Sequence, residues 1–173
     1  MIEIFTKEGD LILDPFCGVG GTLIACNLSN RNGIGIEINQ EWIDVYHKIC
    51  KIESIPPQRI IKGDSREILQ NFSKDPNFKV DFILTDVPFW KMDIIEKSKG
   101  TYKKVGEESK GVYSDKSKLT QFIPNSQNSQ QKKIEWELLI KKTFSECFKL
   151  LKPGRYCAVF IGNMYTEGRY HLL

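Results

Sequence analysis

The chain of 173 residues is long enough for one domain with a buried core, and its 40% hydrophobic and 27% charged residues are ordinary for a soluble globular protein. It has no apolar run of about eighteen residues, so no membrane span is expected, and its start does not resemble a signal peptide. Two histidines without a ligand-spaced partner, and five cysteines without CxxC spacing, argue against a metal site and predict reduced thiols in a cytoplasmic protein. The net charge of +3 is compatible with nucleic acid but decides nothing alone.

The start of the chain predicts a strand, a glycine turn and a helix. Residues 11–13 form a short apolar strand that ends at Asp14, because Pro15 removes the next donor of the ladder. Three glycines follow, at positions where a positive φ is accessible and a ligand can approach the backbone: Gly18, Gly20 and Gly21. Residues 22–28 are apolar enough to return along a sheet as a helix. This order is typical of a nucleotide-binding α/β unit.

Asp14 distinguishes this turn from the dinucleotide fingerprint, where an acidic side chain would repel the pyrophosphate on the helix N-terminus. An acid here suits a ligand with positive charge and amine donors, such as the sulfonium and ammonium of S-adenosylmethionine. The string DPFCGVGGT, from Asp14 to Thr22, resembles the Asp-Pro-Phe-x-Gly-x-Gly cofactor motif of the amino-directed DNA methyltransferases. The resemblance implies cofactor-binding roles for five residues of the turn: Asp14, Phe16, Cys17, Gly18 and Gly20.

Two further strand ends are expected to face the same cleft. Residues 33–38 predict a second buried strand, and Glu37 lies 17 residues beyond Gly20, where such folds bind ribose hydroxyls. Ile38 is assigned to the same cofactor site, while a solvated acid at the strand end remains the alternative for Glu37.

After an amphipathic helix over 40–52, residues 59–62 predict a third strand. Asp64 follows it, placed to accept a hydrogen bond from an adenine amino group, with Ser65 beside it. The alternative is that Asp64 caps the next helix, and both roles can hold together.

A fourth strand over 79–85 runs into the string DVPFW, which resembles the Asp-Pro-Pro-Tyr catalytic motif of the same methyltransferases. The resemblance implies that the Asp86 carboxylate and the Val87 carbonyl accept the N–H hydrogens of an amino group, and that Phe89 stacks on a flipped base. Val87 replaces the first proline and Phe89 replaces tyrosine. Pro88 still holds Val87 extended, so the Val87 carbonyl can face the substrate.

Residues 91–133 form a polar, lysine-rich insertion that suits a nucleic-acid contact surface, or equally a solvated loop without a partner. An amphipathic helix over 134–151 and a fifth strand over 155–162 follow, and residues 164–173 predict a loop or a further helix.

These elements predict one α/β domain over 1–173, with a doubly wound, mostly parallel sheet. The resemblance implies the Rossmann-like class I methyltransferase fold with strand order 3-2-1-4-5. The family normally adds two more strands and a target recognition domain. We therefore expect a fragment, a minimal relative or one half of a split enzyme, with target recognition in a separate domain or subunit as one option.

The implied reaction is methyl transfer from S-adenosylmethionine to adenine N6 or cytosine N4 of DNA, as in the modification enzymes of restriction–modification systems. One alternative is an RNA guanine-N2 methyltransferase, because such enzymes carry similar strings. The other is a non-catalytic subunit that binds the cofactor or nucleic acid without turnover. Turnover onto any oligonucleotide would eliminate the latter.

Overall fold

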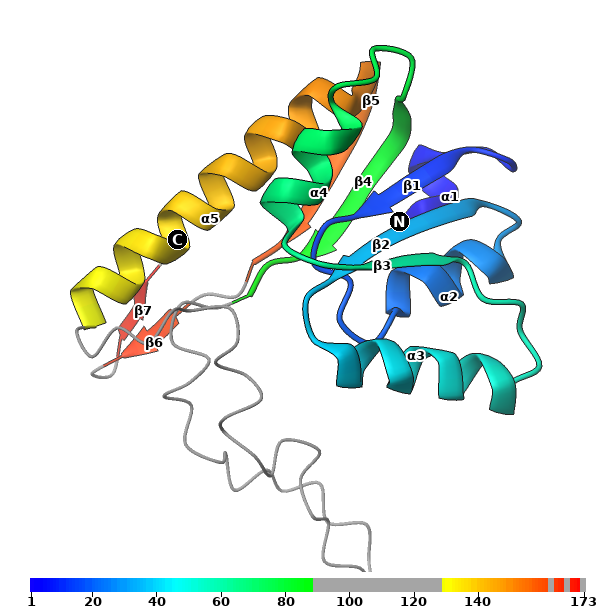
Figure 1. The fold of residues 1–173 in the computed structure, drawn as a ribbon, viewed down its shortest axis with the longest axis horizontal. Helices are drawn as coiled ribbons and strands as arrows, with labels where there is room; N and C mark the ends of the chain where they lie inside the picture. The colour runs from blue at the N-terminus through cyan, green and yellow to red at the C-terminus, as the bar shows by residue number, and fades with distance from the viewer. Residues whose placement is uncertain (89–128, 162–163, 167–168, 172–173) are drawn as a thin grey trace, which may run out of the picture.

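The computed structural model describes residues 1–88, 129–161, 164–166 and 169–171, and its centre is a parallel sheet of five strands in the order β3-β2-β1-β4-β5 (Figure 1). The strands are β1 (Leu11–Asp14), β2 (Asn32–Glu37), β3 (Arg59–Lys62), β4 (Val80–Asp86) and β5 (Leu151–Phe160). The predicted strand order is confirmed. Because the order reverses between β1 and β4, the carboxyl ends of these two strands flank the switch point where ligands of such sheets bind.

Helices cover both faces of the sheet. They are α1 (Ile2–Phe5), α2 (Gly21–Leu28), α3 (Gln40–Ile52), α4 (Ser65–Phe72) and α5 (Ser129–Leu150). Successive side chains of β1 point to opposite faces, so Leu13 joins the core under α4 and α5, while Ile12 joins the core under α1 and α2. In Figure 1 the helices α4 and α5 lie side by side on one of these faces. None of the described helices is long and apolar enough to cross a membrane.

Several boundaries differ from the expectations. The short helix α1 was not predicted, and α5 begins at Ser129, inside the segment assigned to the insertion. Residues 164–173 were expected to be a loop or helix, but β6 (Met164–Thr166) and β7 (Arg169–His171) pair antiparallel in a separate two-stranded sheet. The rest of the insertion lies outside the described residues.

The fifth strand begins at Leu151, although Pro153 and Gly154 predicted an interruption before it. Val80 pairs with Leu151 while Phe82 pairs with Tyr156, so β5 contributes extra residues at this point and forms a bulge. Gly154 has a φ of +73°, which this irregularity requires. Strand β5 therefore includes Pro153 and Gly154 within its bulge instead of starting after them.

Asp81 connects β1, β4 and β5 at the amino end of β4, away from the switch point at the carboxyl ends. Its carboxylate accepts hydrogen bonds from the Leu11 amide (3.1 Å) and the Lys152 ammonium (2.8 Å), and it pairs with Arg155 at 3.1 Å. Burial tends to raise the pKa of Asp81, but these donors and cations outweigh burial and lower it. These contacts fix the start of β5 against β4 and β1.

Candidate active site

The two predicted motifs meet at one edge of the sheet. Strands β1 and β4 are parallel neighbours, with Leu13 paired to Ile83, so Asp14 and Asp86 stand at adjacent carboxyl ends. Asp14 is buried, whereas Asp86 is exposed. Burial raises the pKa of Asp14, and the nearby Asp86 charge adds to this increase. The two candidate motifs therefore lie next to each other at the carboxyl ends of β1 and β4.

Asp14 is the centre of a hydrogen-bond network and is only 3% exposed. One carboxylate oxygen accepts bonds from the Phe16 amide (3.1 Å) and the Thr85 hydroxyl (2.7 Å), and the other accepts from the Thr22 hydroxyl (2.6 Å). These bonds offset only part of the burial effect on its pKa. Asp14 therefore joins the ends of β1 and β4 to the first turn of α2, and the two threonines were not predicted from the sequence.

Two of the three glycines in the turn have the positive φ that was expected of them. Gly18 and Gly20 have φ of +54° and +81°, whereas Gly21 begins α2 without a positive φ, so the expectation for Gly21 was wrong. No heavy atom lies within 4 Å of the position that a Cβ on Gly18 would occupy. A Cβ on Gly20 would instead lie 2.2 Å from the ring of Tyr46. The turn thus has open space over Gly18 and a packed aromatic ring against Gly20.

Glu37 holds the turn from the end of β2. Its side chain is 3% exposed, which excludes a solvated acid. One carboxylate oxygen accepts a bond from the Gly18 amide (2.8 Å) and the other from the Asn39 amide (2.7 Å). Burial raises the pKa of Glu37 despite these donors. Ile38, next in the chain, is half-buried.

Cys17 is buried within the turn, and its amide donates to the Ile36 carbonyl at 2.9 Å. Burial raises the pKa of the Cys17 thiol, and the charges of Asp14 and Glu37 raise it further. A protonated thiol is a poor nucleophile, so Cys17 packs in the turn and is unsuited to covalent chemistry.

Asp64 and Ser65 join the start of α4 to the same turn. Asp64 caps the helix by accepting from the Arg66 amide (2.8 Å) and also binds the Arg66 guanidinium, whose hydrogen bonds lower the pKa of Asp64. The helix-cap alternative is confirmed, and contact with adenine stays a prediction. The Ser65 hydroxyl donates to the Pro15 carbonyl, which ties the two segments together.

The second motif is held by its backbone. Val87 is buried, and its amide donates to the Phe160 carbonyl of β5 at 3.2 Å. The Pro88 carbonyl accepts a bond from the Trp136 indole of α5 at 2.5 Å. Phe89, the predicted stacking residue, lies outside the described residues.

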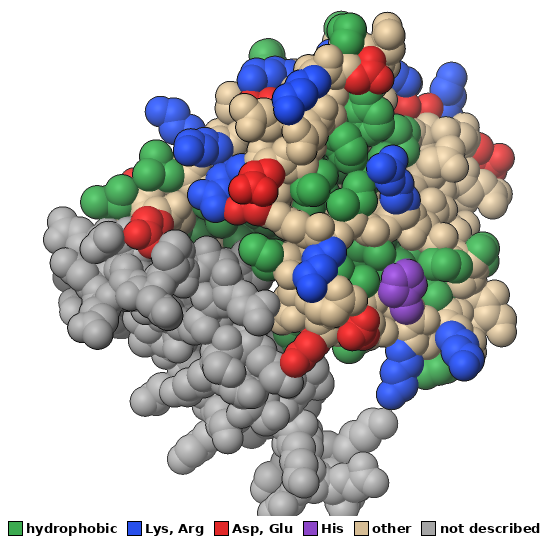
Figure 2. All heavy atoms as spheres, viewed as in Figure 1, with side chains coloured by type: hydrophobic (Ala, Val, Ile, Leu, Met, Phe, Trp, Pro, Cys, Tyr) green, Lys and Arg blue, Asp and Glu red, His purple; other side chains and the backbone are tan. Residues whose placement is uncertain are grey.

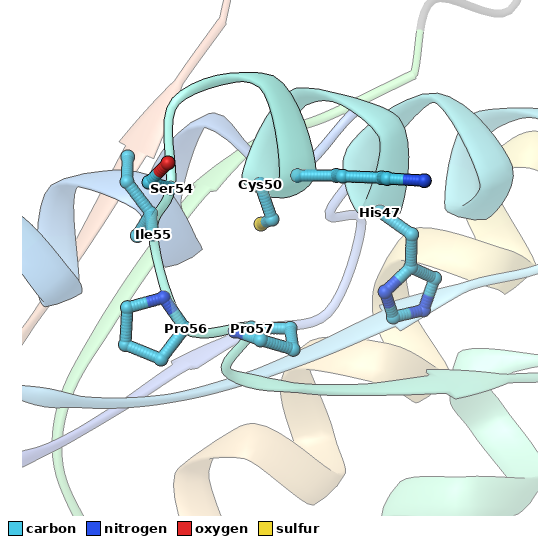
Figure 3. Close-up of a pocket in the computed structure, with 7 residues that line it drawn as sticks. His47, Cys50, Ser54, Ile55, Pro56 and Pro57 are labelled. Atoms are coloured by element: carbon cyan, nitrogen blue, oxygen red, sulfur yellow. The ribbon is translucent and has the colours of Figure 1, made fainter.

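One hollow of about 510 Å³ lies apart from these groups, between the end of α3 and the residues that follow it (Figure 3). Its lining consists of His47, Cys50, Lys51, Ser54, Ile55, Pro56 and Pro57, so it includes none of the predicted site residues. Within the described ranges, no three His, Cys, Asp or Glu side chains gather closely enough to hold a metal ion. Figure 2 shows Lys and Arg interspersed with Asp and Glu over the visible face, so charge does not single out a nucleic-acid surface there.

The strand order, together with a glycine turn that follows Asp14 at the end of the central strand β1, defines the Rossmann-like class I methyltransferase fold. Residues 1–48 match the N6/N4 DNA methylase family. The resemblance to the amino-directed DNA methyltransferases is therefore confirmed over this stretch, which contains the whole cofactor motif.

Relatives by sequence are methyltransferases of two substrate classes. The chain is 32% identical over 119 residues to tRNA (guanine(10)-N2)-dimethyltransferase of Methanocaldococcus jannaschii, covering 63% of this chain and 31% of that protein. It is 49% identical over 45 residues to type II methyltransferase M.HpaI of Haemophilus parainfluenzae, covering 26% of this chain and 14% of the relative. The chain thus spans a third or less of the length of these relatives.

Solved structures share the fold. A protein of Clostridium thermocellum assigned as an rRNA methylase superposes with a TM-score of 0.56 at 18% identity, covering 96% of this chain and 70% of that one. SMU.1697c of Streptococcus mutans, assigned as a methyltransferase and solved in complex with SAH, gives 0.54 at 8% identity, covering 90% and 65%. The predicted fold class is confirmed, and S-adenosylmethionine is the cofactor of the class to which these proteins belong.

Proposed function

We propose that the chain carries the catalytic domain of an enzyme that transfers a methyl group from S-adenosylmethionine to an exocyclic amino nitrogen of a DNA base, adenine N6 or cytosine N4. The observation that carries this proposal is the meeting of two motifs on neighbouring strands, the turn after Asp14 and the Asp86–Pro88 segment. The match of residues 1–48 to the DNA methylase family and the identity to M.HpaI support DNA as substrate.

The residues of the turn fit a cationic nucleoside. The buried carboxylates Asp14 and Glu37 supply negative potential beside the turn, and the space over Gly18 is open. We assign Glu37 and Ile38 to the ribose end of the cofactor, and Asp64 with Ser65 to the adenine end. When bound, S-adenosylmethionine supplies a methyl group activated by its sulfonium.

The second motif would hold the amino group to be methylated. An exocyclic amino nitrogen is a weak nucleophile, because its lone pair is delocalised into the ring. The Asp86 carboxylate and the Val87 carbonyl, by accepting its N–H hydrogens, favour a tetrahedral nitrogen and stabilise the charge that builds on it.

Asp86 and Val87 would hold the nitrogen for bonding to the methyl carbon that the cofactor would supply, and the electron pair of the broken carbon–sulfur bond would stay on sulfur. The nitrogen loses one proton, which the exposed Asp86 can accept and release to water. The base must leave the duplex to reach this position, and we assign Phe89 to stack on it. We further propose that the lysine-rich segment 91–133 contacts the nucleic acid, with target recognition in a separate domain or subunit.

A second candidate is methylation of guanine N2 in RNA. The match to the tRNA enzyme of M. jannaschii supports it, because that match extends over 119 residues, against 45 for M.HpaI. The chemistry at Asp86 and Val87 would be the same, since guanine N2 is also an exocyclic amino group.

Methyl transfer from radiolabelled S-adenosylmethionine to duplex DNA and to tRNA would test both candidates, with the methylated nucleosides separated by chromatography. We expect N6-methyladenine or N4-methylcytosine from DNA, and loss of all transfer in Asp86→Ala. N2-methylguanosine from tRNA alone would favour the second candidate. Calorimetric binding of the cofactor without transfer to either acceptor would contradict both and favour a non-catalytic subunit.

A further inference from the structure

Trp136 is distant in sequence from both motifs but contacts the second one. It lies on α5, 48 residues beyond Pro88, is half-buried, and donates its indole N–H to the Pro88 carbonyl at 2.5 Å. Neither motif contains this residue, which lies within the amphipathic helix predicted over 134–151. The hydrogen bond makes α5 part of the wall that fixes the motif.

A second contact fixes the motif from β5. The Val87 amide donates to the Phe160 carbonyl at 3.2 Å. This bond depends on the departure from the family motif, because a proline at position 87 would have no N–H to donate. Strand β5 thus restrains the φ of Val87 where the family uses a proline ring.

Together the two bonds determine where the Val87 carbonyl points. The amide bond to β5 restrains φ of Val87, and the following proline restrains its ψ to extended values. The Pro88 ring sets its own φ, and the indole bond fixes the orientation of its carbonyl, hence its ψ. The Val87 carbonyl lies between these restrained points, in a peptide plane with little freedom left.

We propose that Trp136 is a positioning residue that orients the Val87 carbonyl toward the amino group being methylated, an inference that rests on the proposed function. Its indole N–H acts through Pro88 and does not touch the substrate. Removing that one donor should slow transfer while leaving the glycine turn after β1, and cofactor binding there, unchanged.

The test compares three variants of the full chain in single-turnover methyl transfer and in calorimetric binding of S-adenosylmethionine. Trp136→Phe removes the donor but keeps an aromatic ring. Replacing Trp136 with 3-benzothienylalanine keeps the bicyclic shape and exchanges the N–H for sulfur, which guards against a packing defect. Phe148→Leu is the matched control on α5, because Phe148 is 83% exposed and lies about 18 Å further along the helix.

We expect the rate constant of transfer to fall about tenfold in both Trp136 variants, with cofactor affinity and melting temperature unchanged, and no effect of Phe148→Leu. If the unaltered chain is active and the benzothienylalanine variant transfers the methyl group just as fast, the positioning role is overturned while the proposed function stands. A loss confined to cofactor affinity would also overturn it. An unaltered chain that binds the cofactor but transfers nothing to DNA or tRNA would contradict the proposed function, and the positioning role with it.

Discussion

Gly20→Ala should destabilise the protein through a specific overlap with one side chain. The φ of +81° costs a residue with a Cβ about 1–2 kcal/mol. The new Cβ would lie 2.2 Å from the ring of Tyr46, which is fully buried. The Tyr46 hydroxyl accepts a bond from the Gln58 amide at 2.7 Å, so the ring is held at both ends and cannot simply move aside. Overpacking of this kind adds about 1–3 kcal/mol, for a total of about 2–5 kcal/mol.

Gly18→Ala is the matched control. Its φ of +54° brings the same kind of backbone strain, but no atom lies within 4 Å of its Cβ position. Urea unfolding followed by circular dichroism should therefore show Gly20→Ala less stable than Gly18→Ala by about 1–3 kcal/mol, with unchanged m-values. The gap should shrink in a Tyr46→Leu background. Equal losses for the two alanines would refute the argument from Tyr46.

Three further changes test the buried charges. Thr85→Val removes a donor to the Asp14 carboxylate, so urea unfolding at neutral pH should show a loss of stability of about 1–3 kcal/mol. This loss should shrink in acid, because acid protonates Asp14, whose pKa is already raised by burial. Glu37→Gln leaves one acceptor oxygen where the carboxylate served the amides of Gly18 and Asn39 with one oxygen each, and it should weaken S-adenosylmethionine binding about tenfold by calorimetry. The Asp81 pKa is lowered because its cationic partners outweigh burial, so its stabilisation is present above the unfolded value of 3.8 and is lost as pH falls through the native value. Asp81→Asn should accordingly destabilise at pH 7 and match the unaltered chain in acid denaturation well below 3.8; a pH-independent loss would contradict this sign.

Much of the fold could be predicted because each strand carries its own apolar run and its own stop. Pro15 ends the first strand and Gly63 and Asp64 follow the third, so these boundaries agree with the structure to within a residue. The start of β5 was placed wrongly, because Pro153 and Gly154 are tolerated at a bulge, which depends on the pairing with β4. Helix α1 is four residues long, too short to show a period.

The site could be predicted only where its residues are contiguous. Asp14 and Asp86 belong to recognisable strings, and two partners of Asp14 lie in its own string, but Thr85 and Trp136 come from elsewhere in the chain. Thr85 precedes its motif as an unremarkable strand residue, and Trp136 looks like one more apolar position on a helix. Hydrogen bonds across 48 or 71 residues leave no local pattern, since only the sheet and the crossover helices bring those partners together.

The burial of Asp14 changes how a loss of cofactor binding must be interpreted. Its carboxylate has about four acceptor positions, and three are filled by the amide of Phe16 and the hydroxyls of Thr22 and Thr85. Alanine at position 14 would remove the acceptor for a ligand and the support of the turn together, so it cannot separate the two roles. Thr85→Val can separate these two roles, because it frees an acceptor position on Asp14 while removing one support of the turn. If Asp14 binds the cationic cofactor directly, the affinity for S-adenosylmethionine should hold or rise. If Asp14 acts only by shaping the turn, that affinity should fall together with the stability of the protein.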